Sequence, residues 1–426
     1  MKQIHDVVIV GGGASGVIAG IFAAQCGAKV LIIEKMKEPL RKLKITGKGR
    51  CNITNNAPLA DFLRKTGPDP DFLKPAFARF FNDDTVSFFN NIGVNTVVER
   101  GGRVFPQSNS AIEVVDKLVL FARAKGVEFK CNSKVKGFIR EDDQITGVEI
   151  VPNQVIKGKS FILAAGGASY PATGSSGDGY PIVTALGHKV TTIRPALVPV
   201  ETSGLTAKNL QGLSLSNVKV NVWIDGKKTD EEMGEMLFTH FGLTGPIILS
   251  LSRRHNDSIQ KKKNVVFSID LKPALDEQKL DNRLQRDLDE NGKMKLSNIF
   301  KFWLPSKLIP EFLRQLSLNG EKLSNQVNAD EKKKIRKLLK DFRFEVTSLR
   351  SFSEAIITSG GISREQINPE TLASMLYPNL YFAGEIIDVD ANTGGYNLQI
   401  AFSTGVLAGE YAAKMALGKQ TQDSIA

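Results

Sequence analysis

The residues with the clearest chemical meaning lie near the N-terminus, where glycines separate an apolar run from a helical one. Gly11, Gly13 and Gly16 are spaced as G-x-G-x-x-G directly after the apolar residues 7–10. In such a turn the first glycine permits a tight bend, the second lets the backbone approach a diphosphate, and the third lets helix and strand pack closely. Glu34 follows about twenty residues later, where a carboxylate accepts hydrogen bonds from ribose hydroxyls. The pattern predicts a dinucleotide site and disfavours a 2′-phosphate there.

A strand, a helix and a second strand must position these residues. The β-branched residues 7–10 are typical of a buried parallel strand. Ala14 and Ser15 begin a helical stretch whose N-terminus offers free N–H groups and partial positive charge to phosphates. Residues 30–33 form the second strand, which ends in Glu34. The alternative is a glycine-rich turn without a ligand, and the complete βαβ unit argues against it.

Later segments favour FAD over NAD at this site. Residues 41–55 mix cations, small residues and amides, which suits a loop over a phosphate and a polar ring, although a basic surface loop is the alternative. Residues 161–167 read as an apolar strand that stops at glycines, and residues 380–385 repeat strand, glycine and acid. Residues 394–398 open the final helix, whose N-terminus would stabilise negative charge on a reduced flavin.

Both ends of the chain contribute strands to one predicted sheet, from residue 7 to about residue 382. That arrangement is typical of glutathione-reductase-type FAD domains with a large insertion. A second G-x-G-x-x-G after a strand is missing from the sequence, so we expect no built-in NAD(P)H domain. We predict an α/β fold with FAD as cofactor: a Rossmann-like FAD-binding domain of the glutathione-reductase type, interrupted by an insert.

Changes in pattern along the chain predict its division into segments. Apolar residues alternate with polar ones over residues 198–224, as in half-buried strands, and residues 276–340 become helical and highly charged. Residues 129–139 and 145–150 resemble strands of a small sheet. We expect an N-terminal FAD part at residues 1–190, an insert at residues 191–350 and a C-terminal FAD part at residues 351–426.

Five motifs resemble a bacterial flavoprotein family that includes aminoacetone oxidases and BaiN-type dehydro-bile-acid reductases. They are TGKGRCNITN at 46–55, GGASYPATGSSGDGY at 166–180, FTHFGLTGP at 238–246, TSGG at 358–361, and AGE, DVD and GGYNLQ within 383–399. The resemblance implies an insert made of a small β-barrel, residues 191–274 and 341–350, and a helical subdomain, residues 275–340. Lys48 stands where many relatives carry glycine.

The resemblance also implies a set of cofactor contacts. These are Ser15, Glu34, Lys35, Gly47, Arg50, Cys51, Asn52, Gly166, Gly384, Glu385, Gly395 and Asn397. From the predicted turns and strand ends we add Gly11, Gly13, Ala14, Gly16, Val135, Ala165, Gly394 and Leu398, with Val135 expected to line the adenine.

Flavin carries the difficult step in such enzymes, so the protein needs few groups of its own for catalysis. His240 is the first candidate, because it lies in a glycine-rich loop, as proton donor or substrate anchor; a structural histidine is the alternative. Tyr396 begins the last helix and is placed to meet the flavin or substrate. Arg50 would pair with a substrate anion or a phosphate. Cys51 is either a packing residue or the site of a thioether link.

Composition narrows the classes of partner. The chain has 426 residues, a net charge of +11 and three cysteines without a C-x-x-C pair, which argues against disulfides and metal sites. The lysine runs at 261–263 and 332–334 are read as solvated faces, with a nucleic-acid groove as the alternative. Glycines interrupt the apolar residues 7–24, so we read a buried strand and helix there, and expect a soluble, cytoplasmic protein without a membrane partner.

These features predict an FAD-dependent oxidoreductase that transfers hydride between a small organic substrate and the flavin. NAD(P)H or oxygen from solution would be the second substrate, and a reductase, a dehydrogenase and an amine oxidase all fit. A flavin-dependent RNA-modifying enzyme is one alternative, suggested by the charge and the helical insert, although the short segment after the last predicted helix argues against it. A non-enzymatic flavin-bound scaffold is another. Neither the substrate nor the oligomeric state can be read from these patterns.

Overall fold

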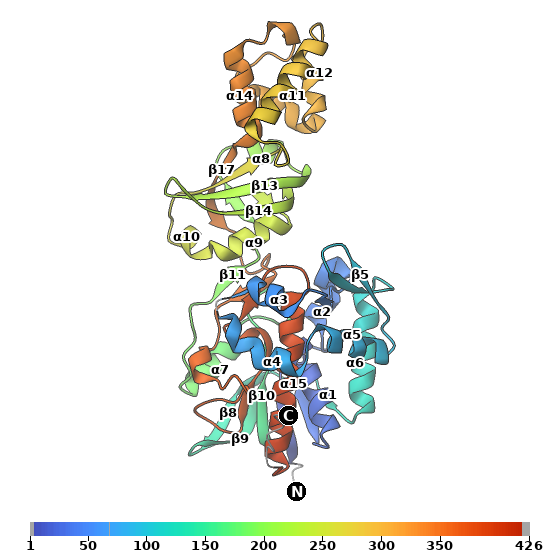
Figure 1. Ribbon diagram of the computed structural model, residues 1–426. Helices are drawn as coiled ribbons and strands as arrows, with labels where there is room; N and C mark the ends of the chain where they lie inside the picture. Colours follow the sequence, from blue (N-terminus) through green and yellow to red (C-terminus); the bar gives the residue numbers. More distant parts are fainter. Residues whose placement is uncertain (1–3, 68, 420–426) are drawn as a thin grey trace. The chain divides into compact units, whose positions relative to one another are not determined.

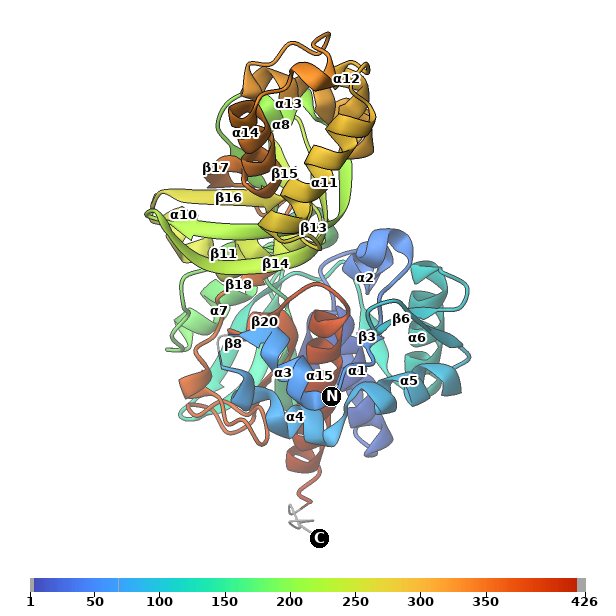
Figure 2. The same ribbon diagram turned by 45° about the horizontal axis from the view of Figure 1, so that its top comes forward.

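The computed structural model describes residues 4–67 and 69–419, and the chain forms two compact units. One unit contains residues 1–195 and 355–426, and we call it the split unit. The other, residues 196–354, we call the insert unit. Figures 1 and 2 show both, with the first and last segments of the sequence interleaved in the split unit.

A largely parallel sheet forms the centre of the split unit. Its parallel strands are β1 (His5–Val10), β2 (Val30–Ile33), β7 (Glu128–Lys130), β10 (Gln154–Leu163) and β19 (Leu380–Phe382). They run in the order β7-β2-β1-β10, and β19 pairs with β10 on its other side. The strands nearest the centre are buried β-branched and apolar runs, as a sheet covered on both faces requires. β10 therefore pairs with a strand from near the start of the chain, β1, and with one from near its end, β19.

Two helices pack closely beside this sheet. They are α1 (Ala14–Gln25) and α15 (Tyr396–Ala416), which lie side by side in both views (Figures 1 and 2). A Cβ atom added to Gly409 would lie 2.3 Å from the carbonyl oxygen of Ala19, and one added to Gly405 would lie 2.6 Å from that of Ser15. Because such distances are sterically excluded, the two helices can approach this closely only through glycine.

A hairpin extends the sheet. It consists of β8 (Val135–Glu141) and β9 (Gln144–Ile150), and β9 pairs antiparallel with the first half of β10. The strand expected over residues 129–139 was wrong, because β7 ends at Lys130 and joins the parallel sheet. The chain then turns at Asn132, which has a φ of 51°, and the N–H of Ser133 donates to the carbonyl of Glu34.

Shorter elements surround the sheet. The helices are α2 (Arg41–Ile45), α3 (Leu59–Lys65), α4 (Lys74–Arg79), α5 (Asn82–Asn91), α6 (Ala111–Ala124) and α7 (Gly179–Ala185). The strands are β3 (Thr54–Asn55), β4 (Thr66–Gly67), β5 (Thr96–Glu99), β6 (Arg103–Pro106), β18 (Ile357–Ser359) and β20 (Asp390–Ala391), and β11 (Arg194–Ala196) lies at the junction of the units.

The insert unit is built on a closed antiparallel barrel. Its strands are β12 (Val200–Thr202), β13 (Ser214–Ile224), β14 (Lys227–Phe238), β15 (Gly242–Thr244), β16 (Val265–Asp270) and β17 (Phe342–Leu349). They close in the order β12-β15-β14-β13-β16-β17. Val218, Val220 and Val222 are buried, so the period-two pattern in the sequence marks the barrel interior.

Helices complete the insert unit. Between β16 and β17 the chain forms α11 (Glu277–Glu290), α12 (Leu296–Ile299), α13 (Ile309–Leu316) and α14 (Ala329–Lys340). The barrel also carries α8 (Thr206–Asn209), α9 (Pro246–Arg254) and α10 (Asn256–Gln260). Leu284, Phe312 and Leu339 are among the fully buried residues that join the helices into one core with the barrel.

Candidate cofactor and active site

The glycine turn between β1 and α1 has the steric properties that a diphosphate cradle needs. Gly11 has a φ of +109°, and a Cβ there would lie 2.4 Å from the carbonyl oxygen of Ala164. A Cβ on Gly16 would lie 2.0 Å from the carbonyl oxygen of Gly11. At Gly13, by contrast, an added Cβ meets nothing within 4 Å. Packing therefore requires two of the glycines, while the third leaves the turn open for a ligand.

The first turn of α1 is free of competing groups. No side chain caps its N-terminus at Gly13, and no acidic residue occupies the turn that Ala14 and Ser15 begin. The N–H groups there and the positive end of the helix dipole are thus available to a phosphate.

Glu34 is held next to this turn. Its Oε2 atom accepts a hydrogen bond from the Gly12 N–H at 2.8 Å, and its Oε1 atom accepts one from the Met36 N–H at 2.8 Å. Two carboxylate oxygens offer about four acceptor sites, so lone pairs remain for ribose hydroxyls. The carboxylate is pre-oriented by backbone donors rather than by a cation.

The carboxyl ends of β10 and β19 meet beside the same turn. Gly166 and Gly384 follow these strands with φ values of +72° and +77°. A Cβ on Gly384 would lie 2.4 Å from the Ser15 hydroxyl oxygen, and the Gly384 N–H donates to Thr404 Oγ1 at 3.0 Å. In doubly wound folds, ligands bind outside the carboxyl ends of the strands.

The loop from Thr46 to Asn52 is conformationally constrained. Gly47, Lys48 and Cys51 have φ values of 58°, 59° and 60°, in the left-handed region. The side-chain oxygen of Asn52 is buried and has no hydrogen-bond partner among the described residues. A buried acceptor without a donor is costly, and a bound ligand with an N–H group would satisfy it.

Cys51 lies in the interior of that loop. Its side chain is fully buried, and burial raises the pKa of the thiol to about 12 despite a hydrogen bond with Thr46. The thiolate is the reactive form of cysteine, and burial disfavours it at Cys51. This environment favours the packing role over a thioether link.

Two cations expected to contact the cofactor have protein partners. The Arg50 guanidinium pairs with Glu99, donates to Asn109 Oδ1 at 2.7 Å, and lies 4.1 Å from the centre of the Phe105 ring. Lys35 Nζ lies 2.7 Å from a carboxylate oxygen of Asp178 and also contacts the Ser176 hydroxyl. Both side chains therefore organise loops of the split unit, and their proposed ligand contacts would come in addition.

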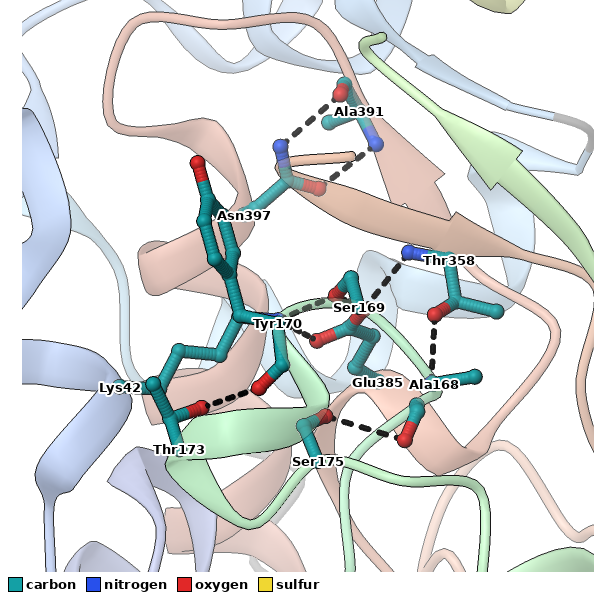
Figure 3. Close-up of polar contacts among 11 residues, drawn as sticks. Lys42, Ala168, Ser169, Tyr170, Thr173, Ser175, Thr358, Glu385, Ala391 and Asn397 are labelled. Carbon is teal, nitrogen blue, oxygen red and sulfur yellow. Dashed lines mark hydrogen bonds and ion pairs between the residues drawn. The ribbon is translucent and has the colours of Figure 1, made fainter. Parts of the chain in front are cut away.

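Glu385 is the centre of a polar cluster that joins four segments (Figure 3). Its carboxylate lies 2.8 Å from Lys42 Nζ and accepts hydrogen bonds from the Ser169 hydroxyl at 2.9 Å and the Thr358 N–H at 2.7 Å. The Thr358 hydroxyl accepts in turn from the Ala168 N–H at 2.7 Å. Burial opposes ionisation of Glu385, but Lys42 and the two donors outweigh it and keep the pKa of the carboxyl below its ordinary value.

The first residues of α15 contact three neighbouring segments of the split unit. Asn397 accepts a hydrogen bond from the Ala391 N–H and donates to the Ala391 carbonyl, both at 2.9 Å (Figure 3). The Tyr396 ring packs edge-on against Phe62 with the centroids 4.6 Å apart. A Cβ on Gly395 would lie 2.3 Å from the Thr54 carbonyl oxygen. These contacts fix a helix whose N-terminus no side chain caps.

The sequence from residue 5 to residue 411 matches the family profile described as "HI0933-like protein Rossmann domain". The chain belongs to the HI0933-like family. It has a Rossmann-type fold, uses FAD as its cofactor and is an FAD-dependent oxidoreductase. These properties follow from the family and from the relatives described below.

Two curated relatives of this HI0933-like chain align over nearly its whole length. The 3-dehydro-bile acid delta(4,6)-reductase of Clostridium scindens is 29% identical and covers 96% of this chain and 100% of its own. The ribosomal RNA dihydrouridine synthase of Escherichia coli is 31% identical and covers 94% of this chain and 96% of its own.

Solved structures share the fold. The 3-ketosteroid delta1-dehydrogenase of Sterolibacterium denitrificans gives a TM-score of 0.54 at 13% identity, covering 97% of this chain and 100% of that one. A quinol-fumarate reductase gives 0.53 at 14% identity, covering 99% and 72%. The expected Rossmann-type fold is confirmed.

FAD fits the residues of this HI0933-like site. The open turn at Gly13 and the uncapped α1 suit the diphosphate, Glu34 suits the ribose, and the buried oxygen of Asn52 suits a donor on the flavin. The remaining predicted contacts lie in the split unit. Val135 is buried at the start of β8, Ala165 follows β10, and Gly394 and Leu398 flank the start of α15.

His240 belongs to the insert unit. It is exposed on the turn between β14 and β15 of the insert unit, with its ring 4.9 Å from that of Phe241. Its role as proton donor or anchor stays a prediction.

Sequence reasoning missed Lys42, Ser169 and Thr358 as site residues. Ser169 and Thr358 stand inside motifs that the family resemblance had marked, so that signal was present. Nothing in the sequence pairs Lys42 with Glu385, because 343 positions separate them.

Within residues 4–67 and 69–419, no helix combines the length and apolarity needed to cross a bilayer. In the same residues, no group of three or more His, Cys, Asp or Glu side chains is arranged to hold a metal ion.

Proposed function

We propose that this protein reduces a carbon–carbon double bond that is conjugated with a carbonyl group, with NAD(P)H from solution as the electron source. One observation carries the proposal. Curated relatives that align over nearly the whole chain are named for a delta(4,6)-reductase and a dihydrouridine synthase. Each name describes the addition of two hydrogens across such a bond, a steroid dienone in one case and the uracil ring in the other.

The residues of the split unit suit this reaction. Bound, reduced FAD supplies a hydride equivalent, and the conjugated carbonyl makes the β-carbon of the substrate its acceptor. Gly13, the N-terminus of α1 and Glu34 would hold the ADP half and so fix the flavin at the carboxyl ends of β10 and β19. The uncapped N-terminus of α15 would offset negative charge at this edge.

The reaction can be tested directly. The flavin of the purified protein is reduced without oxygen, and its reoxidation is followed after adding an α,β-unsaturated ketone, the matching saturated ketone, or oxygen. In a separate experiment the oxidised flavin is mixed with an amine without oxygen. We expect rapid reoxidation by the unsaturated ketone only, with a product heavier by two hydrogens. Reoxidation by oxygen alone, together with reduction of the oxidised flavin by amines, would instead identify an amine oxidase and refute the proposal.

His240 and Tyr396 are proposed substrate contacts, and the same assay tests them. His240→Gln and Tyr396→Phe should slow reoxidation by the unsaturated ketone while leaving the flavin spectrum unchanged. If both variants reoxidise at the wild-type rate, neither residue contacts substrate.

A uridine in RNA is the second candidate substrate for the same reaction. The relative with 31% identity acts on ribosomal RNA by its name, and the chain carries a net charge of +11, which attracts polyanions. Incubation of ribosomal RNA with the enzyme and NAD(P)H, followed by nucleoside mass spectrometry, should reveal dihydrouridine. If the uridine content is unchanged while the ketone is reduced, RNA is not the substrate and only the small-molecule substrate remains.

A further inference from the structure

The insert unit has an open pocket of about 610 Å³ between the end of α13, one face of α14 and the start of β17. Leu316 and Leu338 lie on its apolar part, and Lys334, Lys337 and Arg343 bring three cations to it. We call this pocket, defined by those five residues and Asp341, the α14 groove. All of its lining residues belong to the insert unit, whereas the predicted cofactor contacts belong to the split unit.

The cations of α14 divide into two sets. Lys332 and Arg336 lie 2.9 Å from carboxylate oxygens of Asp281, and Lys340 lies 2.6 Å from one of Asp270. These three cations hold α14 against the rest of the insert unit. A single carboxylate, that of Asp281, pairs with two of them.

The second set is exposed and less closely paired. Lys333, Lys334 and Lys337 are exposed and form no ion pair within 4 Å in the described ranges, although Lys334 interacts electrostatically with Glu331 and Lys337 with Asp341. Lys334 and Lys337 are one turn apart on the helix, so both face the groove. An unpaired lysine contributes little to folding, and two at one pocket favour an anionic ligand.

The carboxylate in the groove does not cancel this charge. Asp341 already accepts hydrogen bonds from Arg343 at 2.8 and 2.9 Å and from the Ser268 hydroxyl at 2.5 Å. Arg343 is therefore committed to Asp341 and to the face of Trp223, 5.0 Å away. The remaining cations of the groove are Lys334 and Lys337, and a lysine ammonium binds phosphate as a point charge.

We propose that the α14 groove binds the phosphodiester backbone of RNA and thereby anchors an RNA substrate independently of the reacting base. The inference rests on the RNA candidate above and deepens it. Lysine–phosphate contacts carry no sequence information, so the groove would supply affinity, and recognition of the uridine would lie elsewhere.

The test compares two variants with the same change of charge. Lys334→Gln/Lys337→Gln removes the free cations of the groove, and Lys261→Gln/Lys263→Gln removes two exposed cations from the loop before β16. Binding of a fluorescein-labelled RNA hairpin to the full-length holoprotein is measured by anisotropy over a series of salt concentrations. Each lost phosphate contact lowers the slope of log K against log salt by about 0.7–0.9.

We expect the groove variant to bind the hairpin roughly tenfold or more weakly near 0.1 M salt, with a slope reduced by about 1.4–1.8. The loop variant should change affinity far less, and both should keep the wild-type flavin spectrum. Equal losses in the two variants, or no RNA binding by the wild type, would overturn the proposal. So would wild-type RNA affinity in the groove variant combined with lost binding to phosphatidylserine vesicles or polyglutamate, which would identify a different ligand. This assay measures RNA binding only. If the ketone is not reduced, the proposed reaction is refuted, whereas the proposal that the α14 groove binds RNA is not affected.

Discussion

Glu34→Gln tests the part of the site on which cofactor binding depends. The carboxylate accepts from the N–H groups of Gly12 and Met36, both at 2.8 Å, and has lone pairs left for the ribose. A carboxamide has one acceptor oxygen, so its NH₂ group must face either a backbone N–H or the ribose hydroxyls. A hydrogen bond to a charged group contributes about 1.5–3 kcal/mol, which corresponds to a loss of FAD affinity of roughly ten- to a hundredfold.

The assay is titration of apoprotein with FAD, followed by flavin fluorescence, with FMN titrated in parallel. FMN lacks the adenosine half, so its weaker binding should be the same in wild type and variant. Glu38→Gln is the matched control, because Glu38 is a half-buried acid nearby in sequence that pairs with Lys44 at 2.9 Å. Its FAD affinity should equal that of the wild type.

Two results would refute the reasoning. Unchanged FAD affinity in Glu34→Gln would show that the carboxylate does not bind the ribose. An equal loss of FMN and FAD affinity, with a lower melting temperature of the apoprotein, would show that Glu34 only clamps the turn through Gly12 and Met36.

Three further predictions concern backbone and charge. Lys48→Gly should raise the free energy of unfolding, measured by urea denaturation, by about 0.5–1 kcal/mol. The left-handed φ of 59° costs a lysine more than the added chain entropy costs a glycine, and a lower urea midpoint in the variant would contradict this. Gly409→Ala should destabilise the protein by about 1–3 kcal/mol in the same assay, since its Cβ would lie 2.3 Å from the Ala19 carbonyl oxygen, and wild-type stability would show that α1 and α15 can separate without cost. Glu385→Gln should lower stability near neutral pH, and its gap from the wild type should close in acid. Burial raises the pKa of Glu385 and the pair with Lys42 lowers it, with a net decrease. The ion pair therefore stabilises the fold above the ordinary carboxyl pKa, and this stabilisation is lost as the pH falls through the pKa of the folded state. A stability difference between variant and wild type that does not change with pH would refute the ion pair.

The sequence alone predicted the part of the site that is built from neighbouring residues. The strand, turn, helix and second strand from β1 to β2 were predicted correctly because hydrophobic period, glycine spacing and the position of Glu34 are all local. The period-two run that became β13 was recognised for the same reason. The family motifs then indicated FAD.

Tertiary structure decided the partners of the charged groups. The cluster of Glu385, Lys42, Ser169 and Thr358 comes from four distant segments that meet only because β10 and β19 are neighbours in the sheet. The pairing of Arg50 with Glu99 was not predicted, whereas its expected ligand contact stays a prediction. An ion pair depends on distance in space, and sequence reports only distance along the chain, so the chemistry of single side chains was predictable while their pairing was not.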